Sequence, residues 1–115
     1  MKYLLAIYSS EAESGKVTPE DGKKMTQAHG AYAEALVKAG VMQGGERLRP
    51  SSDATTVRVR NGKTEVLNGP YAETREQLGG FYLIDVPDLD AALSWAARCP
   101  SSSHGTLEVR PIWAM

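Results

Sequence analysis

The most unusual stretch of the chain is Asn68–Gly80, NGPYAETREQLGG. It sets a carboxylate, Glu73, two residues before a guanidinium, Arg75, between flanking glycines. Glycines allow close approach of the backbone to a ligand, and a carboxylate beside a guanidinium can move a proton or orient a polar substrate. The alternative interpretation, which the residues alone favour, is a polar connection with a surface ion pair, because exposed ion pairs are common and contribute little.

A histidine, His29, is the second candidate for chemistry. It lies in the first half of a predicted helix, between Met25 and Tyr32 of the apolar stripe. A partly buried histidine near a carboxylate could act as general acid or base near neutral pH. The alternative is a boundary histidine that a neighbouring group satisfies, and the residue taken alone favours that alternative.

The other reactive or aromatic side chains give weaker evidence of a functional site than these two candidates. His104 is expected in a turn, and Cys99 is expected at a helix C-terminus, where the dipole disfavours a thiolate. Trp95 and Trp113 are expected in the core or at an interface. The sequence lacks the motifs GxGxxG, GxxxxGK[ST], HExxH and GxSxG, so no dinucleotide, phosphate, zinc-protease or hydrolase signature is present.

Composition bounds the class of protein. The chain has 115 residues, which predicts one domain over residues 1–115. Its 13 basic and 14 acidic residues give a net charge of −1, which argues against nucleic-acid binding and against an electrostatic membrane anchor. One cysteine excludes an internal disulfide and a multi-cysteine zinc site. We therefore expect a cytoplasmic protein with no metal and no cofactor.

Hydrophobic patterning and turn residues predict the elements that must position these groups. Thr18 and Pro19 begin a first helix that ends near Gly40, and Asp88 caps a second helix that Pro100 stops. Strands are expected at Lys2–Tyr8, Val41–Leu48, Thr55–Arg60, Lys63–Asn68, Phe81–Val86 and Thr106–Ile112, with Asn61-Gly62 turning the hairpin. Ser9–Val17 and Tyr71–Leu78 are expected as loops, the second with one helical turn and ended by Gly79-Gly80.

Without the hairpin, this order is βαββαβ, so the predicted fold is α+β and ferredoxin-like with an inserted β-hairpin. Both helices of that fold cover one sheet face. The strands at Lys2–Tyr8 and Phe81–Val86 are apolar on both sides, and a bare apolar sheet face is an association surface. We therefore expect a homodimer joined through the sheet face.

The segment NGPYAETREQLGGFYLIDVPDLDAALSWAARCP resembles the signature of the DGPF (DGPFAETKE) family, part of the YCII-related superfamily. The pieces MKYLLAIY, AGVMQGGERLRPS, ATTVRVRNGK and HGTLEVRPIWAM match as well, so the resemblance covers essentially the whole chain. It implies a dimeric α/β-barrel type of ferredoxin-like fold. It also implies relatives that act on small molecules without a metal or organic cofactor, and members associated with extracytoplasmic-function sigma factors.

The signature is matched in part. Gly69, Pro70, Glu73 and Glu76 agree with it, whereas Asn68, Tyr71 and Arg75 replace its Asp, Phe and Lys. In the wider YCII group a helix histidine eleven residues before the helix-ending glycine is the proposed catalytic residue, paired with an aspartate, and His29 has that spacing to Gly40.

Three functions follow as hypotheses. In the first, the protein is a cofactor-free enzyme or small-molecule binder in which His29 and Glu73 are catalytic, and the substrate-binding residues are Asn68, Gly69, Pro70, Tyr71, Arg75 and Glu76. In the second, it is a non-enzymatic accessory protein associated with a sigma factor. In the third, the signature is purely structural.

Overall fold

The computed structural model describes residues 1–114, so Met115, the last residue of HGTLEVRPIWAM, lies outside the described residues. The helices are α1 (Glu11–Ser14), α2 (Pro19–Lys38) and α3 (Leu89–Arg98), with short 3₁₀ turns at Ser51–Asp53 and Pro100–Ser103. The strands are β1 (Lys2–Ser9), β2 (Met42–Arg47), β3 (Thr55–Arg60), β4 (Lys63–Asn68), β5 (Gln77–Asp85) and β6 (Thr106–Pro111). No helix within residues 1–114 is long and apolar enough to cross a membrane.

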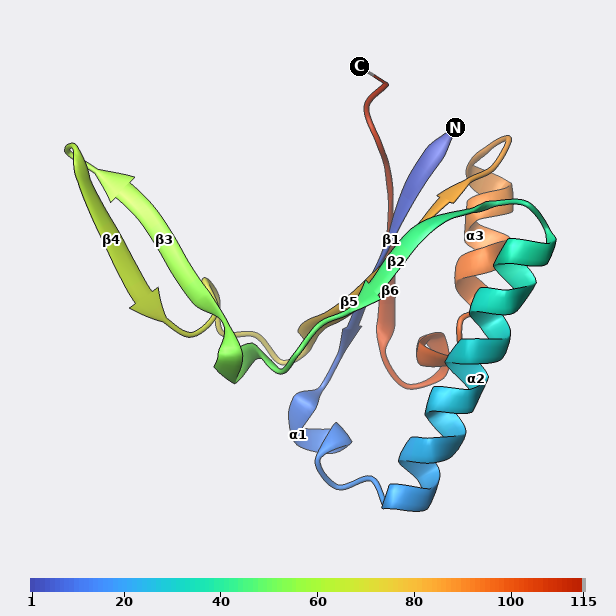
Figure 1. The fold of residues 1–115 in the computed structure, drawn as a ribbon, viewed down its shortest axis with the longest axis horizontal. Coiled ribbons are helices and arrows are strands. Elements are labelled where there is room, and N and C mark those ends of the chain that lie inside the picture. The colour runs from blue at the N-terminus through green and yellow to red at the C-terminus, as the bar shows by residue number, and fades with distance from the viewer. Residues whose placement is uncertain (115) are drawn as a thin grey trace.

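Four strands form an antiparallel sheet in the order β2-β5-β1-β6, while β3 and β4 pair only with each other. Figure 1 shows α2 and α3 on the same side of this sheet. The arrangement is mixed α+β and consistent with the predicted ferredoxin-like βαββαβ order. The core lies between the helices and β1 and β5, where Leu5, Leu36 and Ile84 are fully buried.

The predicted helix starts are confirmed at the atomic level. The Thr18 hydroxyl accepts a hydrogen bond from the amide of Asp21, and Pro19 occupies the first turn of α2. Asp88 caps α3 in the same way, accepting from the amide of Ala91. These local signals fix where each helix begins and so which residues face the sheet.

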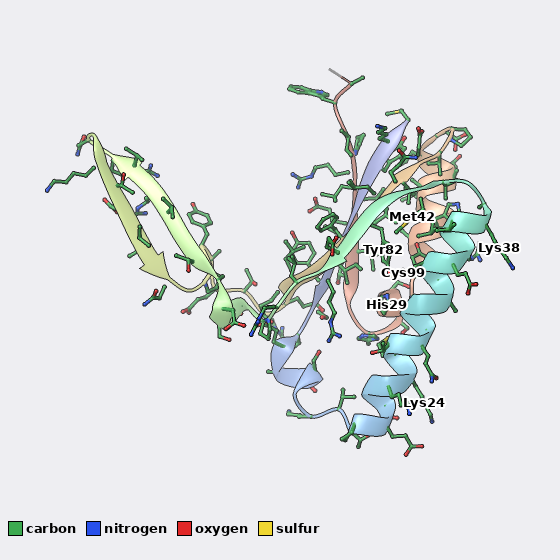
Figure 2. The ribbon with its side chains drawn as sticks, in the orientation of Figure 1. Lys24, His29, Lys38, Met42, Tyr82 and Cys99 are labelled. Atoms are coloured by element: carbon green, nitrogen blue, oxygen red, sulfur yellow. The ribbon has the colours of Figure 1, made fainter. Side chains whose placement is uncertain are left out.

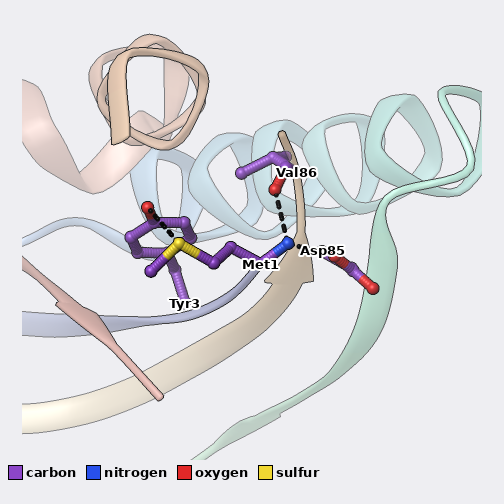
Figure 3. Close-up of polar contacts among 4 residues, drawn as sticks. All are labelled: Met1, Tyr3, Asp85 and Val86. Carbon is purple, nitrogen blue, oxygen red and sulfur yellow. Dashed lines mark hydrogen bonds and ion pairs between the residues drawn. The ribbon is translucent and has the colours of Figure 1, made fainter. Parts of the chain in front are cut away.

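The start of β1 and the end of β5 are tied together beside the N-terminus (Figure 3). The ammonium group of Met1 lies 3.0 Å from a carboxylate oxygen of Asp85 and donates to the carbonyl of Val86 at 2.9 Å. The hydroxyl of Tyr3 lies 3.5 Å from the sulfur of Met1. These contacts reinforce the register in which β1 runs against β5.

The hairpin is the element that matches its prediction most closely. Asn61 and Gly62 both have positive φ, 52° and 75°, as a type I′ turn requires, and the strands have the predicted bounds. Figure 1 shows β3 and β4 extending away from the body of the chain. The radius of gyration is 16.1 Å, against about 13 Å for a compact domain of this size, because the hairpin projects.

Two predictions about connections were wrong. Tyr71–Leu78 contains no helical turn, and Gly79-Gly80 do not end the segment, because β5 already begins at Gln77 and runs through them. Gln77 and Leu78 pair with the end of β1 beyond a register shift, a tertiary pairing that local patterning does not report. Ser9–Val17 is not all loop either, since Ser10 caps the short helix α1.

Candidate functional site

A cavity of about 810 Å³ lies between α2 and the sheet, at the end where α1 and the β2–β3 connection meet. Its size falls within the usual range for small-molecule sites. The polar residues that line it come from elements far apart in the sequence: Ser9, Glu11, Ser14, Thr26, His29, Glu46, Arg47, Arg49, Ser52, Tyr82 and Ser101. The fold therefore gathers groups able to bind and react in one hollow.

His29 is held at both ring nitrogens by hydroxyl groups of this cavity. Nδ1 lies 3.1 Å from the hydroxyl of Tyr82 on β5, and Nε2 lies 2.8 Å from Oγ of Ser101 in the turn after α3. The His29 and Tyr82 rings are stacked, with planes 12° apart. Figure 2 shows both residues in the space between α2 and the sheet.

Local structure explains why these groups meet. His29 precedes Tyr32 by one helical turn, and Tyr32 is buried against the sheet with its hydroxyl donating to the carbonyl of Trp95 at 2.7 Å. Tyr82 shares its strand face with the buried Ile84. Pro100 begins the 3₁₀ turn that carries Ser101, which is 7 % exposed. Each hydroxyl is therefore fixed by the fold.

The surroundings favour the neutral form of His29. Burial lowers the pKa of its imidazole, and the positive charge of Arg47 and the nearby His104 lower it further. Burial raises the pKa of the Tyr82 phenol, with a further contribution from Cys99. Near neutral pH the site thus holds a neutral imidazole and a protonated phenol.

A neutral imidazole donates from one nitrogen and accepts at the other. If Nε2 accepts from Ser101, Nδ1 donates to Tyr82 and the phenol proton is available to a ligand; in the other tautomer, Tyr82 donates to Nδ1 and the Ser101 proton is available. In both tautomers one hydroxyl passes its proton toward His29 and the other presents a donor. This arrangement suits paired proton removal and proton donation.

Two glycines, Gly45 on β2 and Gly80 on β5, line the sheet side of the cavity and let the two strands lie close together. A Cβ at Gly45 would lie 2.9 Å from the carbonyl oxygen of Phe81, and one at Gly80 would lie 2.8 Å from that of Glu46. No side chain at either position could fit without moving a strand. A bulge lies directly before this close approach, where the register of β2 shifts between Met42 and Gly44.

The signature segment lies elsewhere. Glu73 and Pro70 line a second, smaller hollow of about 350 Å³ together with Ser51, Ser52 and Gln77, and none of the residues 68–76 lines the cavity of His29. Tyr71 is 85 % exposed. The structure brings His29 to Tyr82 and Ser101, and it does not bring Tyr71, Glu73 or Arg75 to His29 within one chain.

The remaining predicted residues have identifiable local surroundings. Gly69 has φ 102°, its amide donates to the carbonyl of Ala54 at 2.7 Å, and its carbonyl accepts from Thr56. Asn68 ends β4 opposite Thr55, and Arg75 and Glu76 line neither hollow. Roles in catalysis for Glu73 and in substrate binding for Asn68, Gly69, Pro70, Tyr71, Arg75 and Glu76 stay predictions.

Sequence reasoning missed Tyr82, Ser101 and Arg47. A tyrosine that shares parity with Ile84 on a helix-covered face needs a partner for its hydroxyl, and that signal could have found Tyr82. No signal in the sequence separates Ser101 from Ser102 and Ser103. Within residues 1–114 no three His, Cys, Asp or Glu side chains are grouped to hold a metal ion.

Comparison with known proteins identifies similar chains. Residues 1–115 match the model of the YCII-related domain. The chain is also 38 % identical over 114 residues to an uncharacterized protein of Rhizobium meliloti (strain 1021), R00369, and the match covers 97 % of this chain and 92 % of that protein.

Proposed function

The chain belongs to the YCII-related family, and we propose that it is a cofactor-free acid–base enzyme, or a binder of the same design, acting on a small molecule in the cavity between α2 and the sheet. His29 is the proton-transfer group of this proposal. Ser101 and Tyr82 are the hydroxyls through which it reaches the ligand. The signature NGPYAETREQL leads us to assign the chain, within the family, to the DGPF group.

The observation that carries the proposal is the double hydrogen bond of His29 inside the cavity. The lowered pKa keeps His29 in its neutral form near neutral pH, so one ring nitrogen is free of a proton. A histidine that only bounds the core would also need partners for its ring nitrogens, so it is the position of His29 and its two hydroxyls on a hollow of about 810 Å³ that favours chemistry. The network is therefore suited to chemistry on a bound molecule.

Ligand screening tests this proposal. A metabolite library is screened by thermal shift, because a ligand at 100 times its dissociation constant stabilises the fold by about 2.7 kcal/mol. Hits are then incubated in deuterated buffer, and incorporation of deuterium is followed by NMR for the wild type, His29→Gln and the control Arg60→Gln, whose arginine lies on the hairpin. The proposal predicts exchange that His29→Gln abolishes and Arg60→Gln keeps. Exchange that survives in His29→Gln, or a library without a stabilising ligand, would contradict it.

A second candidate function is that of an accessory protein that binds a sigma factor of the extracytoplasmic-function type. The observation in its favour is the hairpin, where Val57, Val59 and Val66 are 61 %, 58 % and 61 % exposed and share one face by register. Purification of the native chain, with mass spectrometry of what accompanies it, tests this function. A sigma factor lost with Val57→Glu would support it, and recovery of the homodimer alone would count against it.

We also propose the homodimer through the sheet face. The face opposite α2 and α3 carries apolar residues in adjacent pairs, Leu4 beside Leu83 and Ala6 beside Phe81. Leu4, Leu83 and Phe81 are half-buried there, and association of two such faces would remove them from water and form the barrel type of dimer. Leu83→Arg should convert the dimer to a monomer in sedimentation, whereas Lys24→Glu on α2 (Figure 2) should not. A monomeric wild type would refute this association.

A cytoplasmic location completes the proposal. The single cysteine, Cys99, is a buried free thiol, and its chemistry agrees with a reducing compartment.

A further inference from the structure

Arg47, on β2, lines the cavity from the sheet side. Arg47 pairs with Gly80 of β5, and Gly45 pairs with Tyr82. Alternate residues of a strand point to the same face, so Arg47 projects from the face that carries Tyr82 and that α2 covers. The register shift between Met42 and Gly44 produces this orientation, because the extra residue exchanges the two faces of β2 beyond it.

The other charged groups around the cavity have partners or face away. Glu46 pairs with Phe81, on the opposite face of the sheet. The carboxylate of Glu11 accepts hydrogen bonds from the amide and hydroxyl of Ser51, which lower its pKa, and Arg49 forms an ion pair with Asp53 at 2.9 Å. Arg47, by contrast, makes no ion pair with any residue in 1–114.

The unpaired guanidinium lies within electrostatic reach of His29. The charged and titratable groups that surround this imidazole are Arg47 from β2, Tyr82 from β5 and His104 beyond the turn of Ser101. Not one of them is an acid ionised near neutral pH. A cation beside a neutral base is a favourable place for an anion, because the guanidinium offers a planar fork of donors that fits a carboxylate.

We propose that the cavity takes a small organic anion whose carboxylate pairs with Arg47 while an acidic C–H or enol O–H beside a carbonyl faces Ser101 and His29. This inference rests on the function proposed above and names its substrate class. In the step it implies, the C–H bond breaks as its proton passes to Oγ of Ser101, and the proton of that hydroxyl passes to Nε2 of His29. The electron pair moves to the carbonyl oxygen as an enolate, which Arg47 and the Tyr82 hydroxyl stabilise. Return of the proton to the same or a conjugated carbon regenerates His29, so no oxidant or reductant is consumed.

Acetoacetate and its neutral amide, acetoacetamide, are the probes that test the inference, since they share size and an acidic C–H and differ in charge. Binding is measured by calorimetry for the wild type, Arg47→Gln and the control Arg60→Gln, whose arginine lies on the hairpin. We expect acetoacetate to bind the wild type and Arg60→Gln equally, and to bind Arg47→Gln about tenfold or more weakly, as loss of a charge-assisted contact implies. Acetoacetamide should not distinguish the variants.

An NMR titration of His29 supplies a readout besides binding. An anion that pairs with Arg47 offsets the positive charge near His29, so saturating acetoacetate should raise the pKa of the imidazole in the wild type, and much less in Arg47→Gln. Without ligand, Arg47→Gln should itself raise the pKa. Arg47 is exposed, so both variants are expected to fold, and thermal unfolding checks that they do.

The outcomes separate this inference from the proposed function. Equal binding of acetoacetate to Arg47→Gln and wild type, equal binding of the two probes to the wild type, or no binding of acetoacetate would overturn the anion site. Deuterium exchange that is independent of His29, with acetoacetate binding still dependent on Arg47, would leave the anion site standing and refute the proposed function.

Discussion

The βαββαβ body and the β3–β4 hairpin treat their apolar residues in opposite ways. In the body, Leu5, Leu36 and Ile84 are fully removed from water. On the hairpin, the valines that share a face stay more than half exposed, although an isolated two-stranded hairpin is marginal by itself. A single chain therefore buries a core and forms a cavity within the body, whereas the valine face of the hairpin stays open to water.

The signature segment joins these two regions and belongs fully to neither. Its first residues fasten the hairpin through Gly69 and Ala54, and its last residues enter β5. The side chain of Gln77, the first residue of β5, links the segment to α1. It accepts a hydrogen bond from the amide of Glu11 at 2.9 Å and donates one to the carbonyl of Thr74 at 2.6 Å. The cavity that holds His29, Tyr82 and Ser101 lies on the body side of this junction.

The largest expected difference between the regions is in stability. Leu36→Ala removes a fully buried side chain and should lower the free energy of unfolding by about 2–5 kcal/mol. Val66→Ala on the hairpin should change it by less than about 0.5 kcal/mol. Urea unfolding under dilute conditions measures both, and equal losses would mean that the hairpin is packed as tightly as the body.

A smaller effect tests how tightly β2 and β5 approach beside the cavity. Gly45→Ala would set a Cβ 2.9 Å from the carbonyl oxygen of Phe81, and we expect a loss of about 1–3 kcal/mol in thermal or urea unfolding. Gly22→Ala is the matched control. It also replaces a glycine by alanine, at a position within α2 where a Cβ meets nothing within 4 Å. It should be neutral or stabilise by up to about 1 kcal/mol, and equal destabilisation by the two changes would refute the close approach.

The pH dependence of stability isolates His29. Its pKa is lower in the folded chain than its ordinary value of 6.5, so the unfolded chain binds more protons between the two values. The free energy of unfolding should therefore fall as the pH drops from about 6.5 through the folded pKa, and above that range His29 contributes no such loss. His29→Gln should flatten this part of the profile relative to the wild type in unfolding measured from about pH 8 to about pH 5. Parallel profiles for the two proteins would mean that burial does not disfavour the charged imidazole.

The smallest expected effect is at the signature. Glu73 is exposed and makes no hydrogen bond or ion pair through its side chain in the described part of the chain. Glu73→Gln should therefore change the free energy of unfolding by less than about 0.5 kcal/mol, as a melting curve would report. A clear drop in melting temperature would support the purely structural role of the signature, and an unchanged one with loss of a ligand would exclude it.

Local signals made much of the fold predictable, and tertiary pairing accounts for what was missed. The cap at Thr18, the cap at Asp88 and the turn at Asn61-Gly62 act within a few residues of themselves, so their elements begin and turn where predicted. The start of β5 at Gln77 depends instead on pairing with β1 across a bulge. Reading Tyr71–Leu78 from its own polar residues therefore gave the wrong structure.

The site shows the same division. His29 could be proposed from its place in the apolar stripe of a helix, but its partners could not be paired with it from sequence alone. Ser101 is one of three consecutive serines, and only the turn after α3 selects it. Uninterrupted alternation would place Arg47 on the opposite face from Met42, and the bulge at Gln43 returns it to the face of His29 and Tyr82.

The ring nitrogens of His29 give the most direct test of the central claim, that a neutral imidazole held by two hydroxyls is the proton-transfer group of the cavity. Nitrogen-15 NMR of the ring, recorded across pH, reports both its protonation and its tautomer. The account predicts a pKa below 6.5 and, near neutral pH, one nitrogen that bears hydrogen and one that accepts a hydrogen bond, a pattern that Ser101→Ala and Tyr82→Phe each disturb. A ring that titrates at or above its ordinary value, with rapidly averaged tautomers that neither substitution changes, would contradict it.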